Sequence, residues 1–87
     1  MNNRLFFDSM VYDLELMGIK LVVANIDDRS FKGSFISYKR GYVEKVREYL
    51  STWTGFEIHE LKNGKGTRFI ISDKSKITII DFTVGQW

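Results

Sequence analysis

The single histidine of the chain, His59, lies in a stretch where an imidazole could meet a carboxylate. The dipeptide Asn63-Gly64 is a strong signal for a two-residue hairpin turn, which would place Arg68 opposite His59. A second hairpin would then place Asp81 opposite Arg68. Because an imidazole changes charge near neutral pH, His59 in such a row could act as a general base. No nucleophile accompanies the row, so a cross-strand ion pair beside a surface histidine is the simpler interpretation.

The segment Glu60-Leu61-Lys62 has the spacing seen in metal-dependent nucleases, where carboxylates hold a cation and a lysine assists the attacking water. That arrangement also needs an aspartate on the preceding strand, and the preceding segment here is predicted as a helix. The chain has no cysteine, which excludes disulfides and thiolate zinc sites. We therefore expect no metal, no cofactor and no enzymatic activity.

Residues 29–49 interleave basic and aromatic side chains, and cations outnumber carboxylates there. Lys39 and Arg40 fall in a predicted loop, whereas Lys62, Lys65 and Arg68 are expected to gather at the tip of the hairpin. Such a mixture can hold an anionic partner, or it can be a solvated face that keeps a small protein in solution. The candidate binding residues are Lys32, Tyr38, Lys39, Arg40, Tyr42, Lys45, Arg47, Lys62, Lys65 and Arg68.

Within this stretch, residues 32–38 (KGSFISY) have the lysine-glycine opening and alternating aromatic residues of a base-stacking strand. The segment is similar to the strand with which RNA-recognition motifs stack bases. The similarity covers only these residues and departs from the pattern by a one-residue gap. The first strand of that fold has no counterpart here, and we expect Phe31 and Phe35 to face the core.

Hydrophobic periodicity predicts helices over residues 3–17 and 41–54. Asn2 or Asn3 is expected to cap the first helix and Gly18 to end it. Alternating patterns predict strands over 19–26, 30–38, 56–62, 67–72 and 77–84, and the apolar 19–26 strand is expected to be central and covered on both faces. The sequence thus predicts one α+β domain over residues 1–87. It would have two helices on one face of a mainly antiparallel sheet of about five strands, in the order α-β-β-α-β-β-β.

The net charge of +2 conceals an acidic segment, residues 1–28, followed by a basic remainder. No apolar run approaches the roughly 20 residues that span a bilayer, and the N-terminus does not have the pattern of a signal peptide. Together with the absence of cysteine, this favours a cytoplasmic protein without membrane contact.

These features lead us to expect a small non-enzymatic module that docks on a protein or a protein–nucleic acid complex as a stoichiometric inhibitor or regulator. A short chain without cysteine or proline is typical of accessory proteins of phages and mobile elements. The alternative is direct nucleic-acid binding through the same cations. Ile70, Ile77 and Ile79, beside Val22 and Ala24, would leave an apolar sheet face for a homodimer, and Trp87 would plug the core or anchor an interface.

Overall fold

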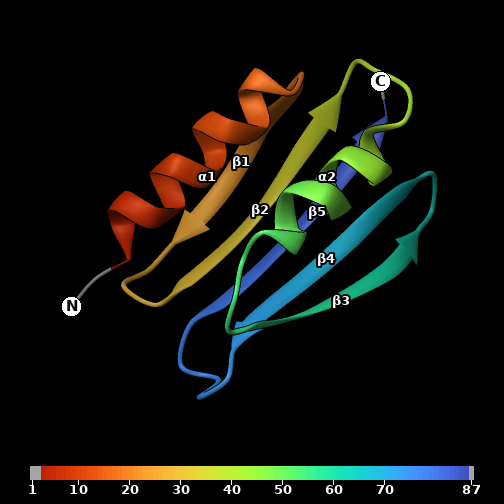
Figure 1. The fold of residues 1–87 in the computed structure, drawn as a ribbon. Helices are drawn as coiled ribbons and strands as arrows, with labels where there is room; N and C mark the ends of the chain where they lie inside the picture. Colours follow the sequence, from red (N-terminus) through yellow and green to blue (C-terminus); the bar gives the residue numbers. More distant parts are fainter. Residues whose placement is uncertain (1–2, 87) are drawn as a thin grey trace.

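The computed structural model describes residues 3–86 and places all the strands in one sheet. Both helices cover the same face of this sheet, and the other face is open (Figure 1). The strand order is β1-β2-β5-β4-β3, and neighbouring strands are antiparallel except β2 and β5, which are parallel. The predicted α+β class and element order are confirmed. The elements are α1 (Arg4–Leu16), β1 (Ile19–Ile26), β2 (Ser30–Ser37), α2 (Tyr42–Ser51), β3 (Phe56–Asn63), β4 (Gly66–Asp73) and β5 (Ile79–Gln86).

The two helices bury the faces that their sequence spacing predicts. Helix α1 buries Phe7, Met10 and Leu14 against the sheet. Gly18 follows it with a φ of 83°, a left-handed conformation that glycine adopts without strain. Asn3 precedes the helix, but its side chain makes no capping bond and donates to the Asp28 carbonyl and to Thr78 Oγ1 instead. Asn3 therefore occupies the predicted N-cap position, but its side chain does not cap the helix. Asn2 and Trp87 lie outside the described residues.

Phenylalanines from three adjacent strands form the centre of the core. Phe31 and Phe35 of β2, Phe69 of β4 and Phe82 of β5 are all buried. The ring centroids of Phe35 and Phe82 lie 5.2 Å apart, edge to face, which is a favourable aromatic geometry. Burying each such ring stabilises the fold by about 1.5–3 kcal/mol before packing is considered. The expectation that Phe31 and Phe35 face the core is confirmed.

Strand β1 is an edge strand with one uncovered face, so its predicted central position is wrong. A β-bulge between Leu21 and Val23 breaks the side-chain alternation on which that prediction depended. As a result Val22 and Val23 are exposed, while Ala24 packs against the core rather than lying on the open face. A bulge in an edge strand also hinders further strand pairing, since it disrupts the ladder there.

The β3–β4 hairpin turns one residue later than predicted. Asn63 pairs with Gly66, and Gly64 has a φ of 61°, so the turn is centred on Gly64 and Lys65. A Cβ at Gly66 would clash with the Val84 carbonyl oxygen, so only glycine fits the close approach of β4 to β5 there. Each expected cross-strand partner is therefore displaced by two residues. A displacement of two preserves which face each side chain occupies, so the alternation correctly predicts the burial of Phe69, Ile71, Ile80 and Phe82. Ile58 lies on the same face but is 38% exposed, so its predicted burial is wrong.

Candidate functional site

Exposed cations gather where β2 and β5 end and β3 turns into β4. Lys39 and Arg40 follow Tyr38 after the end of β2, Lys62 lies near the end of β3, and Lys65 lies in the turn of the hairpin. The pairing of Ser37 with Gln86 and of Asn63 with Gly66 places these segments at the same end of the sheet (Figure 1). We call Lys39, Arg40, Lys62 and Lys65 the basic end.

The basic end carries positive charge that the neighbouring structure does not neutralise. Lys62 and Lys65 line a pocket of about 390 Å³ together with Gly41, at the start of α2. Within residues 3–86, none of the cations of the basic end lies within ion-pair distance of a carboxylate. The aliphatic stem of Lys39 packs against Gly18, and Lys39 is exposed. These charges are therefore free to meet an anionic partner.

Arg47 of α2 also borders this pocket, but its charge is already used within the fold. Its Nε and Nη2 donate to the two carboxylate oxygens of Glu60 at 2.7 and 2.6 Å. These hydrogen bonds lower the pKa of Glu60 below its usual value. Lys45 lies apart, in a shallow pocket beside Met17 and Tyr49. The structure therefore does not bring Arg47 and Lys45 into the basic end as free cations.

The two tyrosines that were predicted beside these cations differ in accessibility. Tyr42 is only 6% exposed, and its hydroxyl donates to the Val84 carbonyl oxygen at 3.2 Å. Tyr42 is therefore a core residue, and the expectation that it contacts a partner is not supported by its position. Tyr38 is 55% exposed and directly precedes Lys39, so it is the aromatic side chain that the basic end offers.

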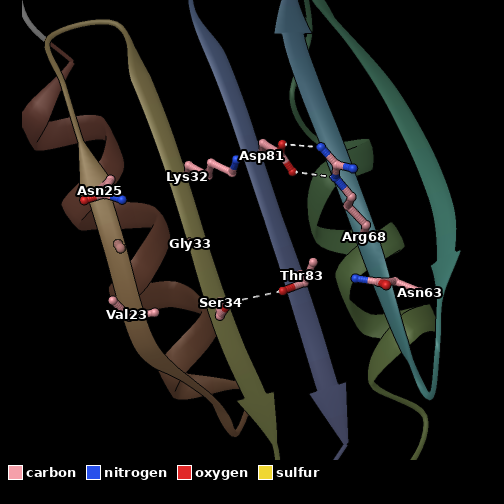
Figure 2. Close-up of a pocket in the computed structure, with 10 residues that line it drawn as sticks. Val23, Asn25, Lys32, Gly33, Ser34, Asn63, Arg68, Asp81 and Thr83 are labelled. Atoms are coloured by element: carbon pink, nitrogen blue, oxygen red, sulfur yellow. Dashed lines mark hydrogen bonds and ion pairs between the residues drawn. The ribbon is translucent and has the colours of Figure 1, made fainter.

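The remaining predicted cations, Lys32 and Arg68, lie on the open face of the sheet (Figure 2). Arg68 donates through Nε and Nη2 to the oxygens of Asp81 at 2.9 and 2.6 Å. This pair lowers the pKa of Asp81, and the charge of Lys32 lowers it further. Ser34 and Thr83 share a hydrogen bond nearby, in a hollow of about 410 Å³. The expected cluster of Lys62, Lys65 and Arg68 is therefore split between two surfaces.

Only part of the predicted row forms: Arg68 pairs with Asp81, as the simpler interpretation expects, but His59 stands apart as a surface residue. His59 lies opposite Ile70, not opposite Arg68, and Arg68 lies opposite Thr83. His59 is exposed, and within the described chain it makes no hydrogen bond. Residues 3–86 hold no group of three or more histidine and acidic side chains that could bind a metal. None of the described helices is both long and apolar enough to cross a bilayer.

Sequence reasoning missed two contacts that tie the helices to their surroundings. The first is the Arg47–Glu60 pair, which strand alternation could have indicated, because Glu60 has the parity of core-facing Phe56. The second is the hydrogen bond from the Tyr49 hydroxyl to Asp13 at 2.7 Å. Burial and this bond raise the pKa of Tyr49.

In comparisons with protein-family models, curated proteins and solved structures, no match to this chain is found.

Proposed function

We propose that this protein is a small non-enzymatic binding module that docks its basic end on an acidic surface of a macromolecular partner. The partner is a protein or a protein–nucleic acid complex, and the module acts as a stoichiometric inhibitor or regulator. The observation that carries the proposal is the contrast in pairing: Arg47 and Arg68 hold carboxylates, whereas the cations of the basic end hold none within residues 3–86. The lack of cysteine favours action in the cytoplasm, in the manner of phage accessory proteins.

The geometry suits this role because charge and an aromatic anchor lie side by side. Exposed lysines and arginines steer association and orient the partner, while most of the affinity of an interface comes from a few large side chains. Tyr38, next to Lys39 and Arg40, can supply such an anchor. Two of the acidic residues, Asp27 and Asp28, lie in the turn after β1, at the opposite end of the sheet. An acidic partner would therefore be oriented toward the basic end.

Direct nucleic-acid binding is the second candidate, and the exposure of Tyr38 favours it. Bases stack on accessible aromatic rings, and adjacent cations contact phosphates. This function requires that the affinity fall steeply with salt, because each phosphate contact releases counterions. A protein partner that is held mainly by apolar contacts would show a weaker dependence.

The test compares two charge-reversal variants that change the same number of lysines. Lys62→Glu/Lys65→Glu alters the basic end, and Lys74→Glu/Lys76→Glu alters the β4–β5 loop at the opposite end of the sheet. Each is measured for binding to labelled single- and double-stranded DNA and RNA across a salt series, and for proteins retained from a lysate. We expect the first variant alone to lose its partner. Equal binding by both variants would overturn the proposed surface, and salt-sensitive binding of naked nucleic acid would select the second candidate.

A further inference from the structure

Helix α2 begins beside two cations of the basic end. Its N-cap is Gly41, which has a left-handed φ of 73° and no side chain that could cap the helix. The first N–H groups of a helix have no carbonyl partner within it, and together they carry a partial positive charge. Lys62 and Lys65 line the same pocket as Gly41 and Tyr42. The start of α2 therefore adds backbone donors to the side chains of the basic end.

A buried threonine that lines this pocket points independently to a ligand. Thr67 lies on the helix-covered face of β4, like Phe69, and is only 5% exposed. It lines the pocket, yet within residues 3–86 its hydroxyl makes no hydrogen bond. No fully buried polar atom of a described side chain lacks a partner, so the Thr67 hydroxyl is not sealed in the core but opens onto the pocket. A hydroxyl in this position is available to a ligand there, because it finds no partner in the protein.

The fold fixes the first turn of α2 next to Thr67. The Tyr42 hydroxyl donates a hydrogen bond to the carbonyl oxygen of Val84, and Val84 is the β5 residue that pairs with Thr67. On the other side, Lys62 of β3 lies opposite Thr67. Backbone N–H groups, a hydroxyl and ammonium groups from separate elements therefore border one pocket.

We propose that this pocket holds a single phosphate group, carried by a phosphorylated serine or threonine of the partner. The inference rests on the proposed docking of the basic end and names the group that this surface recognises. A phosphate monoester carries a charge of about −1.5 to −2 near neutral pH and offers three strong acceptor oxygens. It can accept hydrogen bonds from the first N–H groups of α2, from Thr67 and from a lysine at once. A carboxylate has only two oxygens and satisfies fewer of these donors.

The carboxylates that line the pocket favour one phosphate over a chain of phosphates. Glu44 and Glu60 both lie within ion-pair distance of Arg47. Glu44 is held 3.9 Å from Arg47, further along α2, and it does not cap the first turn. Together with Lys62 and Lys65, Arg47 leaves the pocket only one positive charge in excess. A nucleic-acid backbone would bring further phosphates against these carboxylates, whereas one phosphorylated side chain avoids that repulsion.

Titration of the isotope-labelled protein with inorganic phosphate, followed through its amide NMR resonances, tests the site. We expect saturable shifts that are largest at Val43, Glu44 and Thr67, and no such shifts with chloride at the same ionic strength. Thr67→Val removes the hydroxyl without changing the charge, and it should weaken phosphate binding about tenfold, because hydrogen bonds to charged groups are strong. Thr54→Val makes the same change at an exposed position beyond the other end of α2 and should bind like the wild type.

The Thr67 hydroxyl makes no hydrogen bond in the protein, so Thr67→Val should fold, as thermal unfolding can verify. A wild-type protein that shows no saturable binding of phosphate would overturn the proposal. Equal binding by the wild type and by folded Thr67→Val would also overturn it.

Two matched pairs of probes identify what carries the phosphate. One pair is a peptide with and without phosphate on its single serine, and the other is a short single-stranded oligonucleotide with and without a terminal phosphate. We expect the phosphorylated peptide to bind more tightly than the plain one, to shift the same amides and to compete with inorganic phosphate. Equal affinity for the two peptides would overturn the proposed carrier. A preference for the phosphorylated oligonucleotide over the phosphorylated peptide would overturn it in favour of nucleic acid.

The proposed function and this inference can fail separately. Lys62→Glu/Lys65→Glu tests whether the basic end holds the partner, whereas Thr67→Val leaves every charge in place. If the charge-reversal variant loses its partner but the wild type does not bind phosphate, only the phosphate site is wrong. If phosphate binds in a manner that depends on Thr67 while the charge-reversal variant keeps its partner, the docking surface is wrong and the phosphate site stands.

Discussion

The basic end and the open face contain the same types of cation, yet the fold uses them differently. On the open face, Arg68 is fixed by two hydrogen bonds to Asp81. At the basic end, Lys62 and Lys65 have no ion pair within residues 3–86. Removing Arg68 leaves a partly buried carboxylate without its partner, whereas removing Lys62 leaves nothing unsatisfied. Pairing, and not residue type, therefore separates cations that stabilise the fold from cations that are available to a partner.

The largest contrast should come from the two tyrosines of the segment that leads into α2. Tyr42→Ala is expected to lower the free energy of unfolding by about 3–5 kcal/mol, because it empties a core site and removes the hydrogen bond to Val84. Tyr38→Ala should change it by less than about 0.5 kcal/mol, as is usual for exposed positions. Urea denaturation of both variants measures this. A similar loss for Tyr38→Ala would show that its ring supports the fold and is not available to a partner.

The behaviour of Tyr38 and Tyr42 illustrates how far sequence reasoning reaches. Helical spacing predicts the buried face of α2, but it cannot decide whether a tyrosine at its first turn bends inward. Strand parity correctly separates the core-facing phenylalanines from Lys32 and Arg68, because parity survives a two-residue change of register. Which residues lie opposite each other depends on where a turn is centred. The close approach at Gly66 determines that position, and it is visible only in three dimensions.

A smaller contrast is expected between Arg68 and Lys62. Arg68→Ala should destabilise the protein measurably, since it removes a bidentate ion pair whose carboxylate is partly buried. Lys62→Ala should leave the free energy of unfolding within about 0.5 kcal/mol of the wild-type value. Chemical denaturation at low salt compares the two. Equal losses would remove the distinction between paired and unpaired cations.

The contribution of Asp81 should also depend on pH, in a direction that its pKa determines. Arg68 holds the folded-state pKa of Asp81 below its usual value of 3.8. The pair therefore stabilises the folded state fully above that usual value, and the stabilisation is lost as the pH falls through the folded-state pKa. We expect Asp81→Asn to be less stable than the wild type at pH 7 and the difference to shrink below about pH 4. A difference that stays constant from pH 7 to pH 3 would contradict this account.

The smallest effect is expected at the more exposed pair that borders the basic end. Arg47 lowers the pKa of Glu60, but solvent screens the pair, since the two side chains are 55% and 29% exposed. Glu60→Gln should therefore cost only a few tenths of a kcal/mol. Glu57→Gln, on the same strand but on the open face, serves as the matched control and should cost nothing measurable. Glu60→Gln also removes the charge that pairs with Arg47. If this variant binds an anionic partner more tightly than the wild type, Arg47 contributes to binding once it is unpaired. That result would show that only its pairing with Glu60 prevents Arg47 from acting with the cations of the basic end.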